Sequence, residues 1–191
     1  MSDDRKAPRG RLQLLLIAAV FFGPLLVATW MYQSGALVPE GRSNFGELLE
    51  PVTRLEDAVP GSPAIELADG RWLMLYKNEG HCDDTCFEAL YKMRQTRQMV
   101  GREMERLQRV FLHGETVPDR VVLEGEHPGL ITITDKRLAS LLEAKRPGDA
   151  PPGGIYLIDP LSNLVMYFPP DLDPRDMVDD MKHLLKLSQI G

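Results

Sequence analysis

The sequence predicts an α/β domain behind a single N-terminal transmembrane helix. Three observations predict it: an apolar stretch from Leu12 to Tyr32, an alternation of short apolar runs with amphipathic stretches after Ala64, and a cysteine pair, Cys82 and Cys86, where the first such run ends. The chain has 191 residues, of which 43% are hydrophobic and 26% charged. This composition suits one globular domain with enough chain for a core, plus one extra segment.

The apolar stretch is the extra segment. It reads LQLLLIAAVFFGPLLVATWMY, and as a helix about 20 such residues cross the roughly 30 Å of bilayer hydrocarbon. Four basic residues precede it, and Trp30 and Tyr32 stand at its far end as interface anchors; the basic residues are Arg5, Lys6, Arg9 and Arg11. We therefore expect residues 1–11 in the cytoplasm and 12–32 in the membrane. In a bacterium this is a single-pass inner-membrane protein with its C-terminal domain in the periplasm.

A cleaved signal peptide is the alternative, because Ser34 to Ala36 loosely fits a cleavage site. The apolar stretch is longer than the usual h-region of about 7–15 residues, which favours an anchor. Residues 33–63 are rich in Gly and Pro and show no sustained period, so they predict a tether. The domain is then expected over residues 64–191.

Short apolar runs in this domain predict strands. The run RWLMLYK, residues 71–77, is nearly continuous and is typical of a strand buried on both faces. Further strands are expected in RVFLH, residues 109–113, and in GLITITD, residues 129–135. The stretch GIYLIDPLSNLVMYF, residues 154–168, predicts a hairpin around a Pro-Leu-Ser-Asn turn.

Amphipathic stretches predict three helices between and after these strands. A long helix is expected from Asp84 to about Leu107, with Asp83, Asp84 and Thr85 supplying its N-cap chemistry. Shorter helices are expected in KRLASLLEAK, residues 136–145, and in the final DPRDMVDDMKHLLKLSQ, residues 173–189. Strands and helices in this order, with two cysteines where the first strand meets the first helix, are the layout of a thioredoxin-like fold.

The position of the cysteines gives them a chemistry. A helix N-terminus stabilises a thiolate, so Cys82 is the candidate nucleophile and Cys86 its partner. Four residues at helical rise separate the two by about 6 Å, inside the Cα window of roughly 4.4–6.8 Å that a disulfide accepts. A purely structural disulfide and a metal site are the alternatives. So small a loop removes little chain entropy, which favours a redox or metal role over a structural one.

The stretch GHCDDTCFEAL resembles the T-H-C-P-D-V-C-P-x-x-L motif of the Sco/SenC family, through His81, Cys82, Asp84, Cys86 and Leu90. The segments NFGELLEP, RWLMLY and IYLIDP and the N-terminal anchor are similar to that family as well. The resemblance implies a thioredoxin fold and a role in assembling the copper centre of cytochrome c oxidase.

The chain is a divergent member by this resemblance. The family carries a distal histidine ahead of its Y-L-I-D-P segment, which completes a copper site with the two cysteines, and here that place falls on about Pro151. Asp83 and Phe87 replace the prolines of the motif, and the D-P-x-R-D-T run after the second strand is absent. The third copper ligand of the family is therefore missing.

The side chains available as donors limit which metal the chain could bind. Cys82 and Cys86 suit Cu(I), and a third donor would come from His81, His113 or His127. Neighbouring residues at a helix start rarely point at one ion, which counts against His81. The other histidines, including His183, are expected to be ordinary surface or hydrogen-bonded residues. Structural zinc normally needs four ligands, so no cofactor is certain and Cu(I) remains a candidate.

We therefore expect a membrane-anchored, periplasmic thiol–disulfide oxidoreductase that acts as a reductant or assembly factor for an oxidase copper centre. Its partners are expected to be a respiratory oxidase subunit or another periplasmic thiol protein. The alternatives are a Cu(I) chaperone that uses Cys82 and Cys86, and a redox-inactive docking module. The net charge is -6 and no basic stripe interleaves with aromatic residues, so nothing indicates nucleic-acid binding.

The direction of electron flow is predicted from Asp83 and Asp84. Two carboxylates near Cys82 oppose its thiolate, which favours the disulfide and makes the pair a better electron donor. The alternative is that both aspartates only cap the helix, a position that Asp favours.

Overall fold

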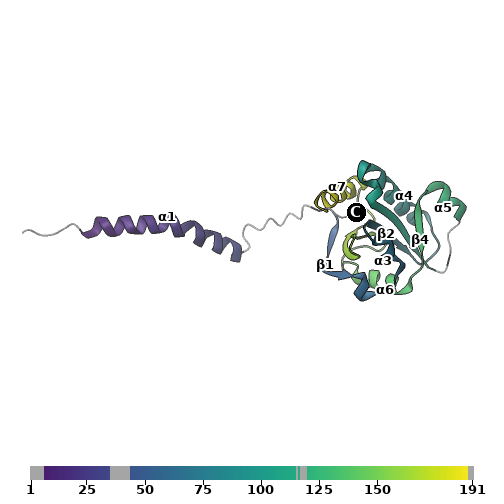
Figure 1. Ribbon diagram of the computed structural model, residues 1–191, viewed down its shortest axis with the longest axis horizontal. Coiled ribbons are helices and arrows are strands. Elements are labelled where there is room, and N and C mark those ends of the chain that lie inside the picture. Colours follow the sequence, from purple (N-terminus) through teal and green to yellow (C-terminus); the bar gives the residue numbers. More distant parts are fainter. Residues whose placement is uncertain (1–6, 35–43, 115, 117–119, 189–191) are drawn as a thin grey trace, which may run out of the picture. The chain divides into compact units, whose positions relative to one another are not determined.

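The computed structural model describes residues 7–34, 44–114, 116 and 120–188, which divide into two compact units, Met1–Ser43 and Asn44–Gly191 (Figure 1). The first unit contains helix α1, Ala7–Ser34. Its segment Leu12–Met31 has a mean hydropathy of 2.3, none of it is buried, and it is long and apolar enough to cross a membrane. The expected N-terminal helix is therefore present.

The second unit is built on one mixed sheet of six strands in the order β1-β6-β5-β2-β3-β4. Strands β2, β3 and β4 are parallel, whereas β5 is antiparallel to β2, and β6 is antiparallel to both β5 and β1. The strands are β1 Glu47–Arg54, β2 Trp72–Asn78, β3 Leu107–His113, β4 Leu130–Ile133, β5 Ile155–Ile158 and β6 Asn163–Phe168. The sheet confirms the predicted α/β class.

Helices cover both faces of this sheet (Figure 1). Buried residues of α4, α5 and α7 pack on one face, and those of α2, α3 and α6 on the other. The helices of the domain are α2 Leu55–Ala58, α3 Pro63–Ala68, α4 Asp84–Met99, the 3-10 helix η1 Gly101–Arg106, α5 Arg120–Glu126, α6 Lys136–Lys145 and α7 Pro174–Leu187.

Strand β2 shows why the sequence folds into layers. Trp72, Met74 and Tyr76 belong to the cluster under α4, and Leu73 and Leu75 belong to the cluster on the other face. Successive side chains of a strand point to opposite faces, so a strand covered on both sides needs apolar residues at every position. Each such side chain stabilises the fold by about 1.5–3 kcal/mol.

The structure differs from the prediction at several places. Strand β1 and helix α2 lie within the residues assigned to the tether, so the folded domain begins before Ala64, and the short helix α3 was not expected. The helix expected to reach Leu107 ends at Met99, because Gly101 has a positive φ of 70° and the chain continues as η1. Helix α5, which no pattern indicated, stands between β3 and β4.

Candidate functional site

The two cysteines lie where β2 passes into α4. Cys82 precedes the helix and Cys86 sits in its first turn. They form a disulfide with Cα atoms 5.1 Å apart, within the range expected from their spacing. The predicted site is thus built by the end of β2 and the N-terminus of α4.

Asp83 starts the helix that carries Cys86. Its backbone is extended, with φ −93° and ψ −172°, and its side chain accepts a hydrogen bond from the Cys86 N–H at 3.1 Å. The Phe87 N–H donates to the Asp83 carbonyl oxygen at 3.0 Å. Of the three residues expected to supply N-cap chemistry, Asp83 is therefore the one that caps, and it binds directly to the backbone of Cys86.

The two cysteines differ in exposure. Cys82 retains 6% of its surface and Cys86 none, and both belong to the apolar cluster that contains Tyr76, Phe111 and Phe168. The little surface that the disulfide exposes therefore belongs to Cys82. Burial in apolar surroundings keeps a thiol inert, which suits Cys86 for an internal role.

The loop between β2 and Cys82 is held by Asn78 and Gly114. The Asn78 side chain accepts from the Gly80 N–H at 2.9 Å and donates to the His81 carbonyl oxygen at 3.3 Å. The Asn78 carbonyl oxygen accepts from the Gly114 N–H at 3.2 Å, and a Cβ on Gly114 would lie 2.3 Å from the Glu79 carbonyl oxygen. Sequence reasoning missed both residues, although Asn at a strand end and Gly after a strand are turn signals.

The carboxylate of Asp83 also affects Tyr76, a buried residue of β2. Burial raises the pKa of Tyr76 to about 12, and the carboxylate of Asp83 contributes next, followed by Tyr167. The Tyr76 ring stacks on Phe111 with centroids 5.8 Å apart. Asp83 therefore acts electrostatically on a neighbour as well as capping α4.

The histidines do not gather around the cysteines. His81 is exposed, and His113 forms a hydrogen bond from Nδ1 to the Gly114 carbonyl oxygen at 2.9 Å. His183 is exposed on α7, as expected for an ordinary surface residue. His127 corrects the expectation, because it is only 3% exposed and neither ring nitrogen has a hydrogen-bond partner among the described residues.

The donor set does not fit the three-coordinate copper site that the resemblance implies. Within residues 7–34, 44–114, 116 and 120–188, no group of three His, Cys, Asp or Glu side chains could hold a metal ion. The structure therefore does not make His81 a third ligand beside Cys82 and Cys86. Pro151, at the place of the family's distal histidine, is exposed, and its carbonyl oxygen accepts a hydrogen bond from the Tyr167 hydroxyl.

A cleft of about 690 Å³ lies at the edge of the sheet that carries the cysteines. It is lined by Glu79 of the loop before Cys82, by His113 at the end of β3, and by Asp135 and Ser140 near the start of α6. The parallel strands β2, β3 and β4 all end at this edge, which places polar side chains beside the disulfide loop.

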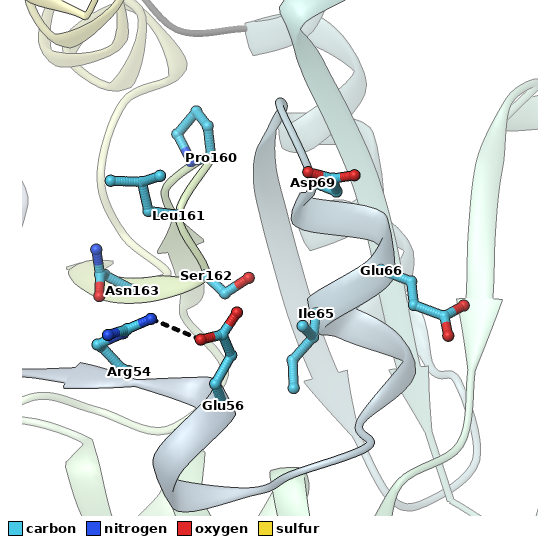
Figure 2. A pocket seen from close by; sticks show the side chains of 9 residues that line it. All are labelled: Arg54, Glu56, Ile65, Glu66, Asp69, Pro160, Leu161, Ser162 and Asn163. Atoms are coloured by element: carbon cyan, nitrogen blue, oxygen red, sulfur yellow. Dashed lines mark hydrogen bonds and ion pairs between the residues drawn. The ribbon is translucent and has the colours of Figure 1, made fainter.

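A second cleft, of about 570 Å³, lies at the opposite edge. Figure 2 shows the Arg54–Glu56 ion pair on one side of it, and on the other Ile65 and Glu66 of α3 with Asp69 directly after that helix. Its remaining wall is the turn 160–163 between β5 and β6. Because Ile158 pairs with Leu73, at the start of β2, this cleft is remote from the cysteines at the other end of that strand.

Known families agree with this architecture. A family model described as transmembrane-like, thioredoxin-like, C-terminal domain matches residues 72–188, and a model described as transmembrane-like, N-terminal domain matches residues 4–35. The chain belongs to this transmembrane-like, thioredoxin-like family. The fold class is thereby confirmed, as is an N-terminal segment of the membrane-anchor type. A search of curated protein sequences finds no match to the chain.

Solved structures of Sco proteins share the fold. Copper-bound ScoI from Arabidopsis thaliana is 20% identical, with a TM-score of 0.51 over 64% of this chain and 88% of its own. Yeast Sco1 is 18% identical, with a TM-score of 0.52 over 64% of this chain and 84% of its own. Apo Sco1 from Thermus thermophilus is 15% identical, with a TM-score of 0.50 over 74% and 91%. The resemblance to the Sco family is confirmed at the level of the fold.

Proposed function

We propose that the protein is a membrane-anchored thiol–disulfide reductant of Sco type, whose domain faces the periplasm and keeps the cysteines of an oxidase copper centre reduced for assembly. The observation that carries the proposal is the disulfide at the N-terminus of α4, in which Cys82 retains the little exposed surface of the pair and Cys86 is fully buried. Thiol–disulfide exchange with a client needs one sulfur that the client can reach and one resolving sulfur, and we assign these roles to Cys82 and Cys86.

The exchange uses only the two cysteines. The Cys82 thiolate attacks one sulfur of the client disulfide, so that a mixed disulfide forms and one client thiolate leaves. The Cys86 thiolate then attacks the Cys82 sulfur, which closes the Cys82–Cys86 disulfide and releases the second client thiolate. Two electrons pass to the client, and the two protons of the original thiols end on its cysteines. A separate thiol reductant must then reopen the disulfide.

The carboxylate of Asp83 supports the direction of this transfer. It stands beside Cys82 in the chain and is bound to the N–H of Cys86. The helix N-terminus favours a thiolate, whereas a neighbouring negative charge opposes it. A reduced form that gains less from its thiolate gives up electrons more readily.

A Cu(I) chaperone is the second candidate, and it rests on the same two sulfurs. Soft thiolates suit Cu(I), but the described residues offer no third donor to complete a Cys2His set. A redox-inactive docking module is the third candidate. It requires that the disulfide, which is nearly buried, never opens.

One set of measurements on the full chain in detergent tests the proposal. Equilibration with glutathione buffers should give a defined reduction potential, and Cys86→Ser should trap a mixed disulfide with a client through Cys82. Cys82→Ser is the matched control and should trap none. Stoichiometric uptake of one Cu(I) per chain against a strong chelator would instead favour the chaperone, and a pair that stays oxidised throughout would favour the docking module.

Orientation and anchoring need their own test. An enzymatic reporter fused after Gly191 should be active only when it is exported, because the basic residues before Leu12 should keep the N-terminus inside. A mature protein that begins near Leu37 and is free of membranes would show that the segment is a cleaved signal peptide instead.

A further inference from the structure

Arg109 is a buried charge without an acidic partner in the part of the chain that the structure describes. It lies in the middle of β3, between Met74 of β2 and Leu130 of β4, and only 3% of its surface is exposed. Its Nη2 donates to the Pro128 carbonyl oxygen, whereas Nε and Nη1 have no partner among the described residues. A buried cation normally needs a counter-charge, because its desolvation is costly.

The charged groups that act on Arg109 are cationic too. Burial lowers the pKa of Arg109 to about 10, and the positive charges of Arg97 and Arg94 on α4 lower it further. Arg97 has its own partners, the Leu107 carbonyl oxygen at 2.8 Å and the Glu105 carboxylate at 3.6 Å. Arg94 donates from Nη1 to a backbone carbonyl oxygen, and its buried Nε has no partner in the described part of the chain.

His127 completes this cluster. Its ring stacks on Phe87 with centroids 6.5 Å apart, and both ring nitrogens are buried without partners. Burial lowers the pKa of His127, and the charge of Arg109 lowers it as well, whereas the carboxylate of Glu126 opposes the shift, so at neutral pH the ring is neutral and carries one N–H donor. His127 lines a cavity of about 450 Å³ together with the acidic Glu124 and with Pro128, whose carbonyl oxygen accepts from Arg109.

We propose that Arg109, His127 and Arg94 form a binding site for a small tetrahedral oxyanion, of which phosphate is the representative. The unused donors come from three separate elements, namely β3, the turn after α5, and α4. Arg94 and Arg109 donate to the carbonyl oxygens of Glu126 and Pro128, on either side of His127, which brings the three side chains together. Donors that approach from several sides suit a tetrahedral anion, whereas a planar carboxylate is satisfied by one guanidinium fork. The anion supplies the negative charge that the protein itself does not place beside Arg109.

The site is separate from the disulfide. It is reached through α5 and the start of β4, whereas the cysteines lie at the end of β2. Phe87 connects the two regions, since it follows Cys86 in α4 and stacks on His127. Failure of the redox proposal would therefore leave the oxyanion site untouched, and the reverse also holds.

Titration of the full chain in nonionic detergent with inorganic phosphate tests the proposal, with sodium chloride holding the ionic strength constant. Calorimetry should show one saturable site, and the melting temperature should rise with phosphate and not with chloride. Arg109→Met and His127→Phe should each weaken phosphate binding at least tenfold. Arg175→Met, which removes the same charge from an exposed position on α7, should leave binding unchanged.

The behaviour without phosphate separates a binding role from a structural one. Arg109→Met keeps the apolar stem and removes an uncompensated charge, so it should be at least as stable as the wild type in phosphate-free buffer. If Arg109→Met fails to fold, His127→Phe still reports on the site. The proposal is wrong if no saturable site exists, if both variants bind phosphate normally, or if acetate stabilises the protein as strongly as phosphate does.

Discussion

Asp83→Asn separates the two roles of the residue that starts α4. The side chain caps the helix by accepting from the Cys86 N–H, and its charge lies next to Cys82. Asn caps about as well as Asp, so the free energy of unfolding should change little. The charge disappears, so the pKa of Cys82 should fall and the reduction potential should rise. Asp83→Ala is the contrasting variant, and it should also lose roughly 0.5–2 kcal/mol with the cap.

The size of the redox effect follows from Coulomb's law. Asp83 is exposed, so its surroundings are close to water, where two unit charges about 4–8 Å apart interact by roughly 0.5–1 kcal/mol. For a two-electron couple this corresponds to about 10–20 mV, towards a less reducing pair. The potential should be measured above the ordinary thiol pKa of about 8.5, where reduced Cys82 is ionised.

Asp84→Asn is the parallel variant, because Asp84 lies in the first turn of the same helix. If the charges matter, each single variant raises the potential and the double variant raises it further. Unchanged potentials in both single variants would leave Asp83 as a cap alone. The electrostatic reason for calling the protein a reductant would then be refuted.

Two other predictions concern the stability of the domain. Gly114→Ala should lower the free energy of unfolding by roughly 1–3 kcal/mol and alter the reactivity of Cys82 toward thiols, because the new Cβ would meet the Glu79 backbone at 2.3 Å. Gly125→Ala is the control, since nothing lies within 4 Å of its Cβ, and it should be neutral or stabilising. Equal melting temperatures for the two variants would contradict this. Burial raises the pKa of Asp180 despite hydrogen bonds from the N–H groups of Gly46 and Phe45, so the folded state binds its proton more tightly than the unfolded state does. Stability from this group is therefore present below the unfolded pKa of about 3.9 and is lost as the pH rises through the folded value. The stability of the wild type relative to Asp180→Asn should accordingly fall between pH 4 and pH 7 in denaturant titrations, and a rise would show that the sign is wrong.

The elements that were predicted correctly are indicated by patterns within a few neighbouring residues. Strand β2 is apolar at every position because both faces are covered, and the hairpin of β5 and β6 has its turn where Ser162 adopts a positive φ of 62°. The spacing of Cys82 and Cys86 predicted their separation, because four helical residues fix it. Periodicity and spacing are properties of a few neighbouring residues, so the sequence contains them directly.

The parts that were missed depend on distant residues. Strand β1 contains Pro51 and a register irregularity between Leu48 and Thr53, so its pattern does not alternate, and only pairing with β6 makes it a strand. Arg109 stands in a strand that was expected, but nothing near it in the chain shows that its surroundings are buried and cationic. His127 was expected to be ordinary for the same reason.

The loop before β5 shows why a reductant needs less from this chain than a copper carrier does. The Tyr167 hydroxyl accepts from the Gly154 N–H at 3.0 Å and donates to the Pro151 carbonyl oxygen, and a Cβ on Gly154 would lie 2.3 Å from the Phe168 carbonyl oxygen. These contacts fix the backbone of the loop, yet the position that matches the family's third ligand offers only an exposed proline. The proposed thiol exchange uses only two sulfurs, and Cys82 and Cys86 form their disulfide without any contribution from that loop.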